Sequence, residues 1–162
     1  MDINPSSILK WNTIYTSVDI KTREIFHTCF RITADSKLQW LQFRILHRIL
    51  PVGSYLKKVK ISTNDICHFC NSDRETLEHV FFSCTKVISL WSDLASYIQQ
   101  KSQNAVVFDS FSIIFGKPFT LANMSINKII LFAKQYIYLN LKQNKSLTFT
   151  GFIAFIHTKQ NT

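Results

Sequence analysis

Residues 66–84 have the sequence ICHFCNSDRETLEHVFFSC, and the interpretation of the whole chain starts from this stretch. Two residues separate Cys67 from Cys70, and the pair is followed by His79 and then by Cys84. Zinc in proteins favours four tetrahedral ligands, usually thiolate sulfur and imidazole nitrogen. A tight turn lets the first two sulfurs face one ion, and a short spacer then brings back the other two ligands. The spacing therefore predicts a zinc site formed by these four residues.

The interval between His79 and Cys84 does not suit one regular helix. Five positions along an α-helix leave two side chains roughly 140° apart. We therefore expect the helix that carries His79 to loosen near Ser83 or to end there. Four protein ligands would fill the coordination sphere, which indicates structural rather than catalytic zinc.

Other interpretations of these residues stay open. The cysteines could be ordinary buried core residues, or Cys67 and Cys70 could be a redox dithiol, although there is no βαβ pattern to favour it. His68 could replace His79 as a ligand, but we expect it to point outward from the turn. Glu75 and Glu78 could orient the ligand histidine or be solvated acids on a helix face.

Composition limits the class of protein. The chain has 162 residues, which suits one domain or one domain plus a tail, and its apolar fraction of 46% excludes wholesale disorder. No apolar run approaches the ~18 residues of a transmembrane helix. Residues 1–5 (MDINP) lack the basic and apolar regions of a signal peptide. These features predict an intracellular protein without a membrane partner, in which cysteines hold a metal rather than form disulfides.

The residue pattern predicts a mainly α fold: a small helical domain built around the Cys-Cys-His-Cys zinc site. Three segments are expected, namely an N-terminal helical flank (1–36), a basic helix with the zinc-binding module (37–100) and a mostly helical extension (101–162). β-branched and aromatic residues predict short strands near 105–115. In the helix expected at 125–143, one stripe is apolar and the opposite face carries Lys128, Gln135 and Lys142. Further helices are expected at 21–33, 37–50, 54–60, 74–83 and 85–101.

Positive charge is concentrated on both sides of the cysteine-rich stretch. The net charge is +9, but residues 61–100 contain two basic and five acidic residues, whereas residues 37–60 contain six basic and none acidic. On a helical wheel of residues 37–50, Leu38, Leu41, Ile45, Leu46 and Ile49 form a core side. The opposite, narrower side of the wheel carries cationic and aromatic residues. It predicts contacts with RNA or single-stranded DNA, since cations neutralise phosphates and an aromatic ring stacks on an unpaired base. The predicted nucleic-acid-binding residues are Trp40, Arg44, His47, Arg48, Lys57, Lys58 and Lys60.

The sequence contains no arrangement of residues that predicts catalysis. No two acidic residues are adjacent, as a Mg²⁺-dependent polymerase or nuclease would favour. Phosphate-binding glycine motifs and nucleophile elbows are absent as well. We therefore expect no enzyme activity from this chain alone and no small-molecule substrate.

The residues resemble a known family. The matching features are Gln42-Phe43-Arg44, His47-Arg48-Ile49-Leu50, Tyr55-Leu56, the Cys67–Cys70 pair, Glu75-Thr76, Glu78-His79-Val80-Phe81, Cys84 and Trp91. This pattern is similar to the reverse-transcriptase zinc-binding region at the C-terminal side of LINE-type (non-LTR) retrotransposon polyproteins. The flanks at 11–15, 114–116 and 127–138 resemble it too.

The resemblance implies an accessory module that helps such a polyprotein bind template RNA or target DNA, with Cys67, Cys70, His79 and Cys84 as zinc ligands. The paired-aspartate polymerase motif is absent, which favours a stand-alone remnant or partial gene product. An alternative is a structural or protein-interaction zinc module that packs against the polymerase region. Its expected surface is the aromatic-rich C-terminal third, with Phe111, Phe115, Phe119, Phe132, Tyr136 and Tyr138.

Overall fold

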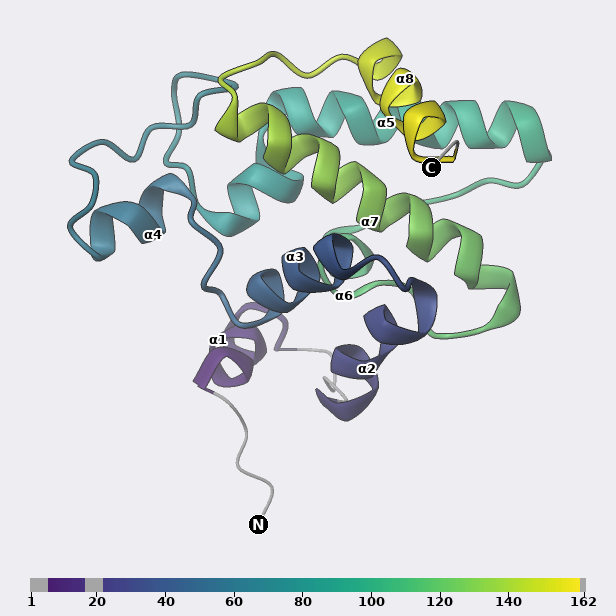
Figure 1. Cartoon of the computed structure of the whole chain (residues 1–162), viewed down its shortest axis with the longest axis horizontal. Helices are drawn as coiled ribbons and strands as arrows, with labels where there is room; N and C mark the ends of the chain where they lie inside the picture. Colours follow the sequence, from purple (N-terminus) through teal and green to yellow (C-terminus); the bar gives the residue numbers. More distant parts are fainter. Residues whose placement is uncertain (1–5, 17–21, 161–162) are drawn as a thin grey trace.

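The computed structural model describes residues 6–16 and 22–160, and regular structure in these ranges is helical (Figure 1). The mainly α fold is therefore confirmed. Residues 1–5, on which the expectation of no signal peptide rests, lie outside the described ranges. No helix within these ranges is both long and apolar enough to cross a membrane. The elements are α1 (Ser6–Ile14), α2 (Thr22–Ile32), α3 (Ser36–Leu46), α4 (Gly53–Lys58), a π-helical turn η1 (His79–Ser83), α5 (Thr85–Ser102), α6 (Ser110–Phe115), α7 (Leu121–Lys142) and α8 (Phe149–Gln160).

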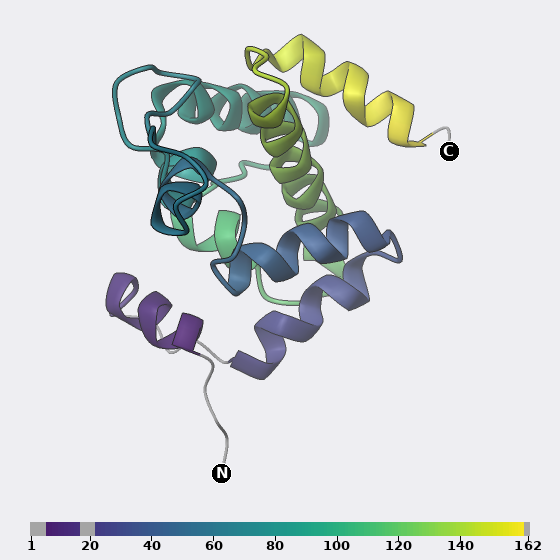
Figure 2. The ribbon, with the colours of Figure 1, turned by 60° about the vertical axis from the view of Figure 1, so that its left-hand side comes forward.

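Helix α7 is the central element of the fold. It contacts α2, α3, η1 and α8, and α3 crosses it in Figure 2. Every residue from Ile130 to Ile137 is buried as a result, which includes the stripe residues Ala133 and Ile137. The prediction that Gln135 lies on a polar face is wrong, since its side chain is only 7% exposed. Helices on several sides of α7 leave little room for a polar face along this part of it.

Helix α3 is shorter than the sequence predicted. Asp35 caps it by accepting the Lys37 N–H at 2.8 Å, and the helix ends at Leu46 because Arg48 adopts a left-handed conformation (φ 57°). The helical wheel therefore no longer predicts the side-chain directions of residues after Leu46. Ile49, expected on the core side, is 42% exposed, whereas the expected core residue Leu38 is fully buried.

The predicted strands near 105–115 are not formed. Residues 104–109 are a loop, and Ser110–Phe115 is α6, which contacts α3 and η1. Asp109 favours the helix by accepting the Ser112 N–H at 2.9 Å. Burial of Ile113 and Ile114 beneath α3 and η1 outweighs the local β propensity of the segment.

A buried polar cluster joins three helices at the centre. The Gln42 side chain on α3 donates to the Ile114 carbonyl of α6 at 2.8 Å, and Lys134 Nζ on α7 donates to Gln42 Oε1 and to the same carbonyl. Burial lowers the pKa of Lys134 to about 7, because the low-dielectric surroundings disfavour the ammonium. The cluster fixes α3 and α6 on α7, although it requires a lysine to be enclosed in the core.

Candidate metal centre

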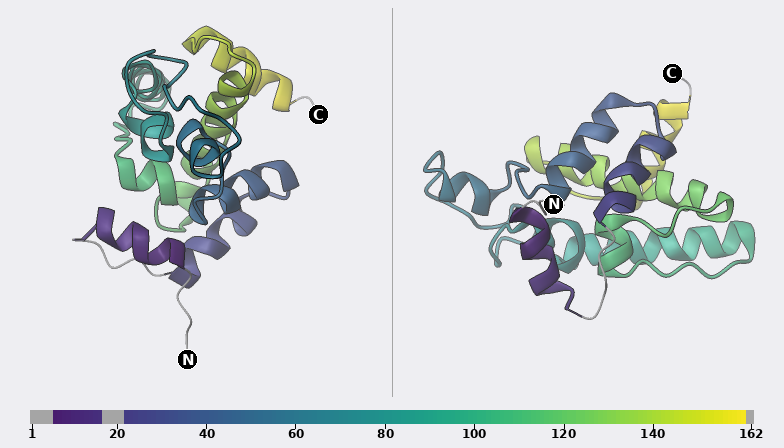
Figure 3. Two further views of the ribbon diagram at one scale, coloured as in Figure 1. Left: turned by 90° about the vertical axis from the view of Figure 1, so that its left-hand side faces the viewer. Right: turned by 90° about the horizontal axis from the view of Figure 1, so that it is seen from below.

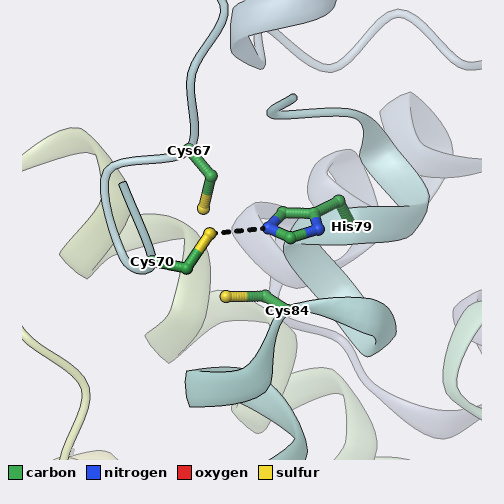
Figure 4. Close-up of side chains that lie close together, drawn as sticks. All are labelled: Cys67, Cys70, His79 and Cys84. Carbon is green, nitrogen blue, oxygen red and sulfur yellow. Dashed lines mark hydrogen bonds between the residues drawn. The ribbon is translucent and has the colours of Figure 1, made fainter. Parts of the chain in front are cut away.

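The metal knuckle, residues 66–84, begins as a tight turn. An antiparallel bridge pairs Ile66 with Arg74, and the Cys67 N–H donates to the Asp73 carbonyl at 2.8 Å. The Asn71 N–H then donates to the Cys67 carbonyl at 2.8 Å, and Asn71 itself adopts a left-handed conformation with φ 55°. This turn brings the sulfurs of Cys67 and Cys70 to one side, as Figure 4 shows.

The second half of the knuckle is a helical turn that widens before it ends. The Cys84 N–H donates to the His79 carbonyl at 3.0 Å, five residues back, which is the π-helical pattern. Each residue of a wider turn advances by less than the α-helical ~100°. Cys84 is therefore closer to the side of His79 than regular helix would place it. The predicted loosening near Ser83 is confirmed.

The four side chains converge on one point from two segments, the turn with Cys67 and Cys70 and the π-helical turn with His79 and Cys84 (Figure 4). The sulfurs of Cys67, Cys70 and Cys84 and a ring nitrogen of His79 all lie within 4.8 Å of one another. Cys70 Sγ is 3.3 Å from His79 Nε2. A tetrahedral zinc ion with Zn–S bonds of ~2.3 Å needs ligand atoms roughly 3.5–4 Å apart. The donor set and its spacing thus fit a metal ion.

Burial shapes the chemistry of the three thiols. Burial raises the pKa of Cys67 to about 12 and also raises the pKa of Cys84. At the half-buried Cys70, burial acts in the same direction, but hydrogen bonds from Ser72, Asp73 and His79 lower its pKa to about 6. Three clustered thiolates repel one another unless a cation lies between them. A bound cation would therefore supply the charge that lets all three ionise.

The imidazole is held by residues of its own turn. The backbone N–H of His79 donates to Thr76 Oγ1 at 3.0 Å and fixes the turn. The ring atom Nδ1 lies 3.5 Å from Ser83 Oγ, which leaves Nε2 toward the sulfurs. Sequence reasoning did not identify Ser83 as this partner. A serine four residues after a ligand histidine on a helix is the signal that could have found it.

Glu75 and Glu78 fit neither of the two alternatives, since both are partly buried and pair with residues other than the histidine. Glu75 Oε1 accepts the Gly53 N–H at 2.7 Å at the start of α4, and Glu78 forms an ion pair with Arg48. Gly53 fits closely here, since an added Cβ would lie 3.0 Å from the Glu75 Cβ. Both acids therefore connect the knuckle to the preceding basic segment rather than to the metal cluster.

Asp65 forms a second connection between the knuckle and α4. Its carboxylate is 2.8 Å from both Lys57 Nζ and Arg74 Nε, and hydrogen bonds from these cations lower its pKa. The side chain of Asp65 is 6% exposed, so two positive groups balance one enclosed carboxylate. Helix α4 and the loop that follows it project at one end of the molecule (Figures 1 and 3).

His68 and Cys29, the other histidine and cysteine considered in the sequence, lie outside the metal cluster. His68 is half-buried, and its ring lies 6.2 Å from the ring of Phe69. It is not among the residues whose ligand atoms gather. Cys29 is 4% exposed in α2, as expected for a core residue.

The predicted nucleic-acid-binding residues fall into two groups. Trp40, Arg44, Lys58 and Lys60 are exposed, and Lys57 is exposed although it pairs with Asp65. His47 and Arg48 are half-buried. Arg48 lies over the Trp11 ring at 4.3 Å besides pairing with Glu78, so it turns away from the arc that the wheel predicted. Burial lowers the pKa of His47, which disfavours its charged form.

A family model described as zinc-binding in reverse transcriptase matches residues 10–91, just over half of the chain. The chain belongs to this family. The reverse-transcriptase zinc-binding match begins within α1 and covers α2, α3, α4 and the whole metal knuckle. It ends at Trp91, whose indole N–H donates to the Phe81 carbonyl at 2.8 Å. A search of curated proteins found no match. The likeness of 114–116 and 127–138 to the same family stays a prediction.

Proposed function

We propose that this chain is a zinc-stabilised nucleic-acid-binding module of a non-LTR retrotransposon reverse transcriptase, without catalytic activity of its own. Its partners would be RNA or single-stranded DNA and the polymerase region of such a polyprotein, within the cell. The observation that supports the proposal most is the Cys67, Cys70, His79 and Cys84 cluster in a member of the zinc-binding family.

A structural role for the ion fits the position of the cluster. Cys67 and Cys84 are fully enclosed, and His79 is 6% exposed. Four protein donors leave no open position for water, which a catalytic zinc ion would need. The ion would hold the turn at Cys67–Cys70 against η1 and the start of α5.

Nucleic-acid binding is supported by the charge of the segment before the knuckle. Lys37, Arg44, Lys58 and Lys60 are exposed, and no ion pair of theirs is found within residues 6–16 and 22–160. Such cations release counterions when they meet phosphates, which makes binding steeply dependent on salt.

Fluorescence anisotropy with labelled RNA and single-stranded DNA tests this proposal. For zinc-loaded protein, affinity should fall linearly on a log–log plot against salt. Replacement of Lys58→Ala together with Lys60→Asn should lower the slope by roughly one per lysine lost. Asn suits residue 60 because its φ is 61°. The control pair Lys101→Ala and Lys145→Ala should keep the slope, and no binding at low salt would refute the proposal.

The alternative of a protein-interaction module has one supporting observation. A hollow beside Trp91 is bordered by Ile88 and Val107, which are 51% and 70% exposed. The aromatic set expected to form such a surface is less available, since Phe115, Phe132 and Tyr136 are buried within the chain. Val107→Glu should weaken co-purification with a polymerase region without changing nucleic-acid affinity if this hollow binds it.

A further inference from the structure

Side chains of α3 and α7 line a groove. The two helices cross in Figure 2. Its volume is about 370 Å³, and its walls include Trp40 and Arg44 from α3 and Gln135 and Tyr138 from α7. Helix α7 lies outside the residues that match the family model. The groove therefore combines part of the predicted nucleic-acid surface with residues to which no role has been assigned.

The aromatic wall of the groove is open to a ligand. Trp40 is 60% exposed and rests edge-on against Phe43 at 5.5 Å, which holds the indole at the groove. Tyr138 is half-buried on the other side, and Lys142 Nζ lies 5.6 Å from its ring centre. A planar ring of suitable size could stack on the exposed indole.

Gln135 supplies an unpaired acceptor at the same groove. Its side chain is 7% exposed, and its Oε1 atom is buried without a hydrogen-bond partner in the described part of the chain. Buried polar atoms are nearly always satisfied in folded proteins, so each exception needs an explanation. As the side chain stands, this oxygen has no surface open to the groove, so an N–H group of a ligand would satisfy it only after the Gln135 side chain turns toward the groove.

The charge around the groove selects the class of ligand. Lys37 and Arg44 line it, both are exposed, and neither has an ion pair among the residues described. The nearest acid in sequence, Asp35, is already used as the α3 cap. Two free cations, an open indole and an orphaned acceptor together suit a nucleotide with its base unpaired.

We propose that this groove binds one unpaired base of single-stranded RNA or DNA. The base stacks on Trp40, and the Gln135 side chain turns toward the groove so that its Oε1 accepts an N–H of the Watson–Crick edge. The flanking phosphates meet Lys37 and Arg44. This inference rests on the proposed nucleic-acid binding and adds a base contact from α7. A duplex is excluded because its Watson–Crick N–H groups are already paired and its bases are stacked.

Tryptophan fluorescence tests this directly, because the other two tryptophans, Trp11 and Trp91, are 0% and 4% exposed. Four oligomers of equal length are compared: cytidine RNA, cytidine DNA, a duplex and an abasic phosphate backbone. Both single strands should quench the emission of Trp40 and bind more tightly than the duplex or the abasic strand. The relative affinities of the RNA and DNA strands identify which of the two the groove prefers.

Two variants complete the test. Gln135→Met keeps the size of the side chain and removes the orphaned oxygen, so the fold should persist while affinity for the single strands falls about fivefold. Trp40→Leu should lower it about tenfold or more. The control Gln100→Met, at an exposed position on α5, should change nothing.

The outcomes separate this inference from the wider proposal. If single, duplex and abasic strands bind equally, with the same salt dependence and no effect of Gln135→Met or Trp40→Leu, the base site is refuted and the charge-based binding stands. If none of the oligomers binds at low salt, both are refuted.

Discussion

The metal knuckle and the helices around α7 are held together by different interactions. In the knuckle, a bridge at Ile66 and Arg74, the ion pairs of Asp65 and four metal-ligating side chains position a chain with little regular structure. Around α7, apolar side chains such as Leu38, Ile130 and Ile137 are almost fully buried and share one core. The knuckle would therefore draw much of its stability from a bound ion, whereas the helical core depends on the apolar area that it removes from water.

The two regions meet at η1. Val80 and Phe81 are fully buried and belong to the shared core, although their neighbours His79 and Cys84 belong to the metal cluster. The second half of the knuckle is thus supported from both sides. The first half contributes Cys67 and Phe69 to that core and otherwise relies on polar contacts and on the ion that its two cysteines would help to hold.

Removal of the metal should produce the largest effect, and it should act on the knuckle while the helical core around α7 stays folded. A chelator, or Cys70→Ser, should expose the backbone of residues 61–76, because zinc binding contributes on the order of 10 kcal/mol in small zinc modules. Hydrogen exchange should show lost protection there and retained protection in α7. Cys29→Ala, in the core, should keep zinc, and unchanged exchange at 61–76 after chelation would contradict the assignment.

A cavity in the helical core should destabilise the helices around α7 and leave the knuckle unchanged. Leu38→Ala removes a fully buried side chain and should lower the free energy of unfolding by about 2–5 kcal/mol. Zinc content should not change, since the knuckle keeps its ligands. Leu121→Ala, at a position 87% exposed, is the matched control and should cost less than ~0.5 kcal/mol in denaturant titrations.

The buried lysine makes the stability of the core depend on pH. The pKa of Lys134 is lowered to about 7 in the folded state, so the penalty for burying its charge is complete below that pH and vanishes above its ordinary value of 10.5. The free energy of unfolding should therefore rise between these pH values, by up to ~1.4 kcal/mol per unit.

The readout is the difference between two variants on the same helix. Lys134→Met should remove this rise, whereas Lys128→Met, at an exposed position on α7, should retain it. Chemical denaturation at several pH values measures it, and parallel curves for both variants would show that Lys134 is not enclosed as described.

The carboxylate of Asp65 should give the smallest effect. Hydrogen bonds from Lys57 and Arg74 lower its pKa, so its stabilising contribution is present above the ordinary value of 3.8 and is lost as pH falls through the folded value. Asp65→Asn should lower the melting temperature slightly at neutral pH and remove this acid sensitivity. Asp93→Asn, at an exposed site, should leave both unchanged.

The sequence predicted the metal cluster because ligand spacing is a local property. Cys67, Cys70, His79 and Cys84 lie within one short stretch, and the mismatch of His79 with Cys84 even predicted the loosened turn. The mainly helical class was equally accessible, since the apolar stripe of α7 is periodic.

The errors arose where tertiary contacts override local pattern. The β-branched segment at 105–115 forms a loop and α6 because other helices cover it. Arg48 leaves the helical wheel because α3 ends at Leu46 and because Glu78, thirty residues on, attracts it. Burial of Lys134 and Gln135 depends on how many helices surround α7, which no single helical pattern reveals.

Zinc X-ray absorption on protein purified without added metal tests the central claim most directly. One zinc ion per chain is expected, with three sulfur neighbours at about 2.3 Å and one nitrogen at about 2.0–2.1 Å. In Cys84→Ser, the sulfur count should fall to two or the ion should be lost. A protein that contains no zinc, or zinc surrounded mainly by oxygen, would contradict the account.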